Sequence, residues 1–108
     1  MISRIVSCTI KPEKISEFRT ALKRAVLPNL ARQPGFVDLV ESIDPATGTF
    51  VCTTLWNTRQ DVEHYDQTLF PELAQKLVPL LNGQPDIKTL TVENSTVHDI
   101  GSGKSAAA

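Results

Sequence analysis

The spacing of apolar and polar residues predicts a strand and then a helix in the first third of the chain. Residues 2–10 mix apolar positions with Ser and Thr and contain neither Gly nor Pro, which favours a strand. After Lys11-Pro12, apolar residues recur every three or four positions, as on one face of a helix: Ile15, Phe18, Leu22, Ala25, Val26 and Leu30. Pro28 lies inside this pattern, so we expect a kink or an early helix end there, because proline lacks an N–H donor and crowds the preceding turn.

The rest of the chain repeats the alternation of strand and helix signals. Residues 36–43 and 49–56 are predicted strands, joined as a hairpin by the turn-forming residues 44–48. A second helical region follows Thr58, which has Asp61 three residues later and so carries the spacing of a capping box. Phe70-Pro71 is expected to divide this region into two pieces, because the residue before a proline avoids helical geometry. Residues 86–94 alternate as a last strand.

The predicted order β-α-β-β-α-β is that of an α+β ferredoxin-like fold, a four-stranded antiparallel sheet with both helices on one face. The strands carry apolar residues on both faces, however. In the second strand the alternation sets Val37, Leu39 and Ile43 against Phe36 and Val40. An apolar sheet face without helices needs a cover, and a second copy of the chain is the simplest one. We therefore expect a homodimer in which two sheets enclose a shared interior.

Length, composition and charge restrict the class of protein. The 108 residues are enough for one domain, which we expect over residues 1–97, followed by a flexible Gly/Ser/Ala-rich tail over residues 98–108. The formal net charge is -1 and no basic stripe is present, which argues against nucleic acid as a partner. The apolar runs are too short for a membrane span, and the first residues do not resemble a signal peptide, so a cytoplasmic location is the default expectation.

Two cysteines and two histidines offer little metal or nucleophile chemistry. Cys8 and Cys52 lie within predicted strands, and we interpret them as buried, reduced thiols; a disulfide or a metal pair is the alternative. His98 lies past the last strand and is expected to be an exposed tail residue. The sequence has no glycine-rich phosphate loop, no metal-ligand spacing and no serine-histidine-acid signature, so we expect no metal and no cofactor.

The strand that ends at Trp56 and the helix that follows it hold the candidate site. Phe50, Cys52 and Thr54 share a face with Trp56 by the two-residue period, and we predict that these four residues bind a substrate. The alternative for Trp56 is a purely structural anchor.

The helix that follows contributes His64 and Tyr65 as candidate catalytic residues; the alternatives are a surface histidine and a tyrosine that caps the core. Elsewhere in the sheet, Arg4 and Asp38 alternate with apolar neighbours. They are expected to be solvated near an edge; an interior ion pair or substrate clamp is the alternative.

Residues 1–94 resemble the dimeric α+β barrel proteins, and among them the antibiotic-biosynthesis-monooxygenase-like group. The resemblance rests on Pro34-Gly35-Phe36, on the turn at residues 44–48, and on Trp56 followed by Val62 and Tyr65. It implies a dimeric barrel and a group of proteins that includes cofactor-independent oxygenases, haem-degrading enzymes and members without known activity.

The resemblance transfers unevenly to individual residues. Trp56 matches the tryptophan that ends the third strand in many members, whereas a common histidine nine residues later falls on Tyr65, with His64 one step before it. Quinone-forming members place an asparagine where this chain has Cys52. Haem-degrading members have a histidine ligand in the second helical piece, and residues 70–75 contain none, so haem is disfavoured.

The sequence thus predicts a cofactor-free, monooxygenase-like enzyme that acts on a small hydrophobic or aromatic substrate of quinol or polyketide type. The cluster of Trp56, His64 and Tyr65 favours this reading. The missing asparagine favours the alternative, which is a non-catalytic dimer of the same fold that binds a small ligand or acts as a stability module.

Overall fold

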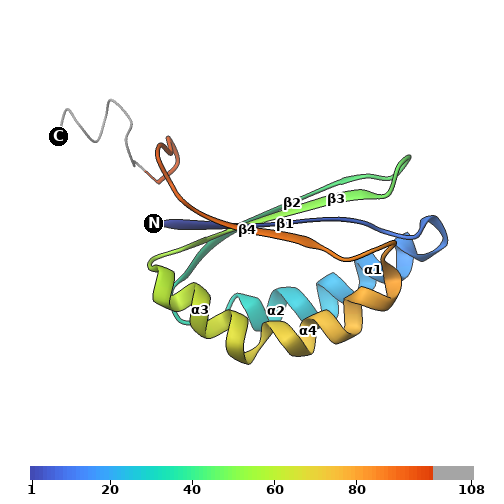
Figure 1. The fold of residues 1–108 in the computed structure, drawn as a ribbon, viewed down its shortest axis with the longest axis horizontal. Helices are drawn as coiled ribbons and strands as arrows, with labels where there is room; N and C mark the ends of the chain where they lie inside the picture. Colours follow the sequence, from blue (N-terminus) through green and yellow to red (C-terminus); the bar gives the residue numbers. More distant parts are fainter. Residues whose placement is uncertain (99–108) are drawn as a thin grey trace.

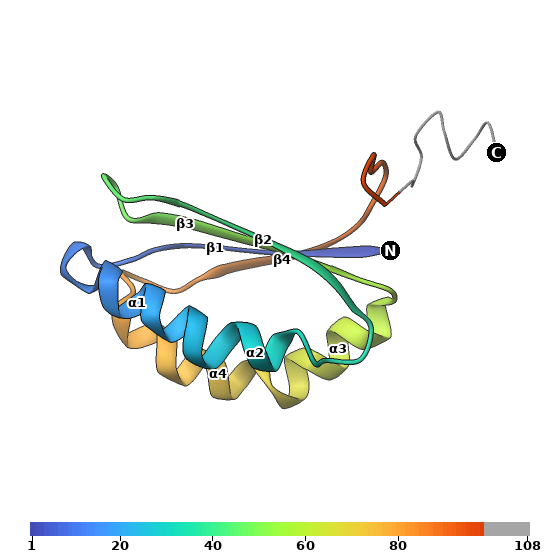
Figure 2. The same ribbon diagram turned by 180° about the vertical axis from the view of Figure 1, so that it is seen from behind.

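The computed structural model describes residues 1–98 and has the predicted ferredoxin-like architecture. Its elements in chain order are β1 (Ile2–Thr9), η1 (Pro12–Lys14), α1 (Ile15–Ala21), η2 (Leu22–Val26), α2 (Leu27–Leu30), β2 (Phe36–Asp44), β3 (Thr49–Trp56), α3 (Arg59–Thr68), α4 (Phe70–Leu77), η3 (Val78–Leu80) and β4 (Asp86–Thr91). The four strands form one antiparallel sheet in the order β2-β3-β1-β4. All helices lie beneath one face of this sheet, as Figures 1 and 2 show from opposite sides.

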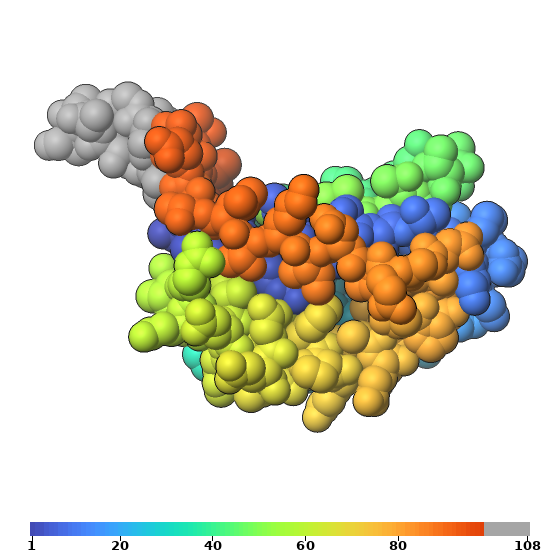
Figure 3. Space-filling model, in the orientation of Figure 1, coloured from blue at the N-terminus to red at the C-terminus, as the bar shows by residue number. Residues whose placement is uncertain are grey.

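The core lies between the sheet and the helices. Ile10, Phe18, Trp56 and Val62 are its largest fully buried side chains. Figure 3 shows how closely the two layers meet along the β4 edge, where α3 and α4 lie directly below the short last strand. The last strand ends at Thr91, three residues before the predicted end.

The first helical region stays helical through Pro28 but changes its hydrogen-bond spacing. Residues 22–26 form a π-helical segment, and the Leu27 N–H bonds to the Leu22 carbonyl five residues back. Pro28 follows at once, within α2. The missing proline N–H and the crowding of the preceding turn give a physical reason for the wider turn, so the predicted kink takes the form of a π segment.

A threonine and a proline set the boundaries within the second helical region. α3 and α4 are separate helices joined at Leu69, as predicted from Phe70-Pro71. Thr58 caps α3, since its Oγ1 accepts a hydrogen bond from the Asp61 N–H at 3.1 Å. The Asp61 carboxylate in turn accepts a hydrogen bond from the Thr58 hydroxyl at 2.8 Å. In the standard capping box, the side chain at this position accepts from the backbone N–H of the cap residue instead.

The alternation predicted for the second strand is wrong at its start. A register shift between Phe36 and Asp38 places Phe36 opposite Trp56 and Leu39 opposite Thr54, so Phe36 and Leu39 lie on the same, helix-facing side. The Phe36 and Trp56 rings meet edge-to-face at 5.7 Å. A β-bulge inserts one residue, here Val37, and thereby reverses the facing of every residue before it.

The last described residues return to the sheet instead of leaving it. The Val92 N–H bonds to the Met1 carbonyl, and His98 Nε2 lies 3.2 Å from Asp38 Oδ2 on β2. The expectation that His98 is an exposed tail residue is therefore wrong, because Asp38 holds it against the sheet. Residues 99–108, most of the predicted tail, lie outside the described residues.

Candidate functional site

Two of the hollows between the sheet and the helices are neighbours and carry polar side chains. The inner cavity has a volume of about 60 Å³ and lies under β1 and β3; its walls are Arg4, Val6, Leu22, Val26, Leu30, Glu41, Phe50, Cys52, Thr54, Tyr65, Phe70, Leu73 and Leu77. The outer groove, of about 250 Å³, lies where α1 and η2 face β2; its walls are Phe18, Arg19, Leu22, Lys23, Leu27, Glu41, Ser42, Ile43 and Phe50. Leu22, Glu41 and Phe50 line both hollows and so separate them.

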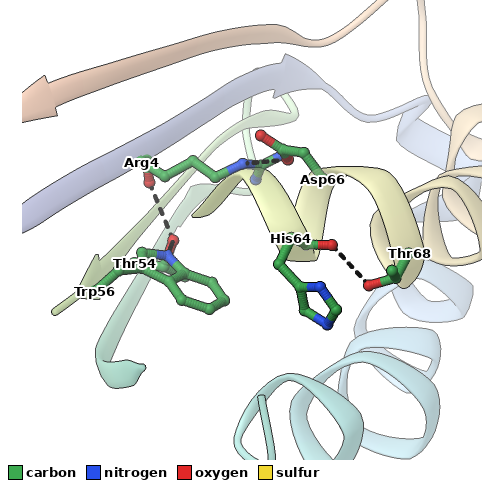
Figure 4. A network of polar contacts seen from close by, with 6 residues as sticks. All are labelled: Arg4, Thr54, Trp56, His64, Asp66 and Thr68. Carbon is green, nitrogen blue, oxygen red and sulfur yellow. Dashed lines mark hydrogen bonds and ion pairs between the residues drawn. The ribbon is translucent and has the colours of Figure 1, made fainter. Parts of the chain in front are cut away.

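Arg4 is the buried cation of the inner cavity. Its side chain is 3% exposed, and its Nε donates a hydrogen bond to Asp66 Oδ1 at 2.9 Å (Figure 4). Its Nη2 lies 2.8 Å from the same oxygen but outside hydrogen-bond geometry, so within residues 1–98 this buried nitrogen has no hydrogen-bond acceptor. The guanidinium also lies 4.3 Å from the Phe70 ring centre and 5.1 Å from that of Tyr65. The expectation of a solvated Arg4 is wrong, because α3 brings Asp66 and the aromatic rings over it.

Trp56 is fully buried and hydrogen-bonded. Its Nε1 donates to Thr54 Oγ1 at 2.8 Å, and Thr54 Oγ1 donates to the Arg4 carbonyl at 3.3 Å (Figure 4). The Trp56 ring lies 5.1 Å from the Tyr65 ring. Trp56 is not among the residues that line the inner cavity, so the indole lies behind Thr54 and Tyr65, which do.

Three of the four predicted binding residues share the inner cavity. Phe50, Cys52 and Thr54 all line it, and Tyr65 enters it from α3. Burial is the main reason that the pKa of Cys52 rises to about 12, with the nearby Glu41 adding to the effect and Arg4 opposing it. Burial likewise raises the pKa of Tyr65 to about 12. Near neutral pH, both groups are therefore protonated, and Tyr65 is a hydrogen-bond donor.

His64 lies apart from this cluster. It is exposed on α3 and lines neither hollow, and its backbone carbonyl accepts the Thr68 hydroxyl at 2.7 Å (Figure 4). The helical step of about 100 degrees between consecutive residues explains why His64 faces solvent while Tyr65 faces the core.

Glu41 is a residue of interest that the sequence analysis missed. It lies opposite Cys52 in the register of β2 and β3, and it lines both hollows. Its Oε2 is buried without a hydrogen-bond partner within residues 1–98, and burial raises the pKa of the carboxyl group. The signal in the sequence was a carboxylate at the two-residue period between Leu39 and Ile43, on a face otherwise apolar.

The described residues also bear on two other kinds of site. Within residues 1–98, no three side chains of His, Cys, Asp or Glu gather in a way that would hold a metal ion. No described helix combines the length and the apolar character that a membrane crossing requires.

The arrangement in space is similar to that of several solved structures. A conserved protein from Methanosarcina mazei Go1 matches with a TM-score of 0.74 and 18% identity, over 82% of this chain and 89% of that one. SnoaB, a cofactor-independent oxygenase from Streptomyces nogalater, matches with a TM-score of 0.73 and 19% identity, over 88% and 95% of the two chains. The monooxygenase ActVA-Orf6 of Streptomyces coelicolor, solved with the ligand Nanaomycin D, matches with a TM-score of 0.72 and 18% identity, over 87% and 88%.

These identities are low, so the solved structures establish the fold alone. The comparison with curated proteins found no match. The family model for antibiotic biosynthesis monooxygenase, however, matches residues 1–80, which is most of the chain and includes β1, β2, β3 and all the helices. The chain therefore belongs to the antibiotic biosynthesis monooxygenase family.

Proposed function

We propose that this protein is a cofactor-independent monooxygenase that oxidises a small aromatic substrate of quinol or polyketide type between its sheet and its helices. The observation that carries the proposal is the inner cavity, which combines aromatic walls with a carboxyl group that has no partner among residues 1–98. Membership of the family supports the reaction type. Phe50, Cys52, Thr54 and Tyr65 are the proposed binding residues, with Trp56 supporting them from behind.

The proposed chemistry needs one proton acceptor and a substrate that can donate electrons. In a phenol, Glu41 would take the hydroxyl proton, and the electron pair of the broken O–H bond would stay on the oxygen and be delocalised into the ring. The ring would then react with dioxygen: one oxygen atom enters the ring to give a quinone, and the other leaves as water. The protein's part is to deprotonate, orient and shield the substrate.

We place the base at Glu41 and not at His64. A base must reach the substrate within hydrogen-bond distance, and Glu41 lines both hollows whereas His64 lines neither. The raised pKa of Glu41 also brings this carboxyl group closer to the range in which general bases work well. Tyr65 is proposed as a donor that orients a substrate oxygen, since its phenol stays protonated.

The size of the hollows indicates where a ring can enter. A cavity of about 150 Å³ can hold benzene, so the outer groove can accept a ring and the inner cavity alone cannot. A substrate that reaches Arg4 from the groove has to displace Phe50 or the π-helical segment around Leu22. Such segments are often found at functional sites.

We further propose that the protein is a homodimer. The sheet face without helices carries exposed apolar side chains, among them Val40, which is 61% exposed, and Leu90, which is 49% exposed. A second sheet packed on this face would cover them. The hollows lie on the opposite, helix-covered side, so the proposed dimer leaves the groove accessible.

The alternative is a non-catalytic dimer that binds a small ligand or acts as a stability module. Cys52 favours it, because the thiol is protonated near neutral pH and a weak hydrogen-bond group at this place in the cavity. Saturable binding of phenols without dioxygen uptake would support this alternative.

An oxygen electrode tests the proposal with a panel of one-, two- and three-ring phenols. The wild type is expected to consume dioxygen with at least one member of the panel. Glu41→Gln is expected to lower the rate by about 10²–10⁴-fold, the usual contribution of a general base. His64→Gln is the matched control and is expected to retain the wild-type rate. Equal losses in both variants would contradict the assignment of the base.

A further inference from the structure

The buried charge of Arg4 is only partly compensated. Both Nε and Nη2 approach a single carboxylate oxygen, Asp66 Oδ1, and Nη2 has no acceptor within residues 1–98. The Asp66 side chain is 37% exposed, so water screens its negative charge, whereas Arg4 is 3% exposed. The inner cavity therefore has a positive end.

The surroundings of Arg4 fit a planar ligand. Its guanidinium lies 4.3 Å from the Phe70 ring centre and 5.1 Å from that of Tyr65, and all three residues line the inner cavity. An aromatic ring inserted there meets flat walls on which it can stack. Thr54 is a poor alternative partner for a ligand oxygen, because its hydroxyl already accepts from Trp56 and donates to the Arg4 carbonyl.

Arg4 and Glu41 line the inner cavity from the two strands that flank β3. Arg4 on β1 pairs with Thr54 of β3, and Glu41 on β2 pairs with Cys52 of β3. Arg4 and Glu41 are therefore two strands apart and offset by two residues along the strands. Standard strand spacings give a Cα separation of roughly 12 Å. A ring that lies over Cys52 and Thr54 can thus have one end toward each group.

We propose that Arg4 binds an oxygen that is conjugated with the ionising hydroxyl of a phenol or enol ligand. The ligand then occupies the inner cavity, widened by displacement of Phe50 or of the segment around Leu22, as a planar anion. The proposal rests on the proposed function for the location of the ligand and for Glu41 as the proton acceptor. When the proton passes to Glu41, the electron pair of the broken bond is delocalised over the ring. Part of the negative charge then falls on the conjugated oxygen at Arg4, which in 4-nitrophenol is a nitro oxygen, and the guanidinium stabilises it in a site of low polarity.

The test measures the pKa of 4-nitrophenol bound to the full chain, because its phenolate absorbs visible light and its neutral form does not. Binding to the wild type is expected to lower the pKa of the probe by about one unit or more, a tenfold shift toward the phenolate. Arg4→Met is expected to abolish this lowering. Arg19→Met is the matched control: it removes a cation that lines the outer groove but not the inner cavity, and the lowering is expected to persist.

The other titratable and charged groups that face the two hollows are Glu41 from β2, Cys52 from β3, Tyr65 from α3, and Arg19 and Lys23 from the first helical region. Cys52 and Tyr65, with pKa values of about 12, stay neutral while the probe titrates. The pKa of bound 4-nitrophenol is also measured in Glu41→Gln, which shows how much of the shift comes from titration of the Glu41 carboxyl group.

Asp66→Asn separates an electrostatic role of Arg4 from a structural one. Removing the carboxylate leaves the Arg4 charge uncompensated, so the pKa of the bound probe is expected to fall further than in the wild type. A purely structural role predicts no such increase. An unshifted probe in the wild type, a lowering that survives Arg4→Met, or an equal or smaller lowering in Asp66→Asn would overturn the proposal.

The readout requires no turnover. A lowered pKa of bound 4-nitrophenol, together with no dioxygen uptake from any phenol of the panel, leaves the Arg4 assignment standing and rejects the oxygenase. Failure of 4-nitrophenol to bind counts against the Arg4 site, whatever the result with other phenols.

Discussion

The polar side chains beneath the sheet fall into two groups by their hydrogen bonds. The Trp56 N–H and the Thr54 hydroxyl are paired with each other and with the backbone of β1. Glu41 Oε2 and Arg4 Nη2 are buried without hydrogen-bond partners within residues 1–98. An unpaired buried polar atom is costly to the fold. We therefore propose that the hydrogen bonds of the first group stabilise the fold, with Thr54 contributing to binding only as part of the cavity wall, and that the second group acts on ligands.

Substitutions at Trp56 test the structural role. Trp56→Ala should cost about 3–5 kcal/mol of unfolding free energy, because it removes a fully buried large aromatic side chain. Trp56→Phe keeps most of the packing but loses the hydrogen bond to Thr54, and a cost of about 1–2 kcal/mol is expected. Urea denaturation measures both values. A near-neutral Trp56→Ala combined with lost ligand binding would instead make the indole a binding wall.

The raised pKa values of Cys52 and Tyr65 predict a loss of stability in alkali. The folded protein holds both groups in their neutral forms. Their contribution to the free energy of unfolding is therefore fully present below the ordinary pKa values of 9.0 and 10.0. It is lost as the pH rises from there toward about 12, because the folded protein resists ionisation that the unfolded chain accepts. Unfolding free energies measured from pH 8 to 12 should fall over this range. Tyr65→Phe should make the fall less steep, and an unchanged slope in that variant would contradict the assignment.

At the scale of elements, the turn before β2 and the start of α3 depend on each other. Gly35 has a φ of 80°, and a Cβ at this position would collide with the Asp61 carboxylate, which accepts the hydroxyl of the cap residue Thr58. The Asn57 N–H also bonds to the Gly35 carbonyl at 2.8 Å. The link fixes the path of the chain from Trp56 into the helix that supplies Tyr65 and Asp66.

Gly35→Ala is therefore expected to destabilise the fold by more than the cost of the backbone conformation alone. Gly83 is the matched control: its φ is 82°, and a Cβ there would meet nothing within 4 Å. Gly83→Ala should cost about 1–2 kcal/mol, the usual penalty of the left-handed conformation. Gly35→Ala should cost clearly more in the same thermal or urea experiment. Equal costs would show that the contact with Asp61 is unimportant.

The sequence predicted the elements better than it predicted which residues meet. Pro12, Pro28 and Pro71, together with the glycine turns, act locally, so the order and approximate ends of strands and helices could be predicted. The bulge at Val37 could not be predicted, because the alternation of apolar and polar residues does not show where a residue is inserted. The pairing of Arg4 with Asp66 joins residues 62 positions apart and depends on how α3 crosses β1.

The candidate site was predicted in part for the same reason. Phe50, Cys52 and Thr54 lie on one strand, so the strand period alone brought them together. Glu41 and Arg4 come from the two strands on either side of β3 and depend on sheet order and register. The exposure of His64 depends on the angle at which α3 begins, which the sequence left open.

At the scale of the whole molecule, the sheet face without helices predicts the assembly. The wild type should behave as a dimer in analytical ultracentrifugation at micromolar concentration, with an interface of at least roughly 1,000 Å². Val40→Lys places a charge on the face without helices and should shift the protein toward monomer. Gln75→Lys adds the same charge at an exposed position of α4 and should leave the dimer intact. A monomeric wild type would refute the proposed dimer.

We propose that this chain inserts oxygen into an aromatic ring without a cofactor. The most direct measurement incubates the purified protein with ¹⁸O₂ and the phenol that supports the fastest dioxygen uptake, and then analyses the product by mass spectrometry. The expected product is a quinone that carries one labelled oxygen atom, with the second label in water and one dioxygen consumed per quinone. A phenol that binds saturably and is recovered unlabelled, with no dioxygen consumed above the protein-free rate, would contradict the oxygenase and favour the ligand-binding dimer.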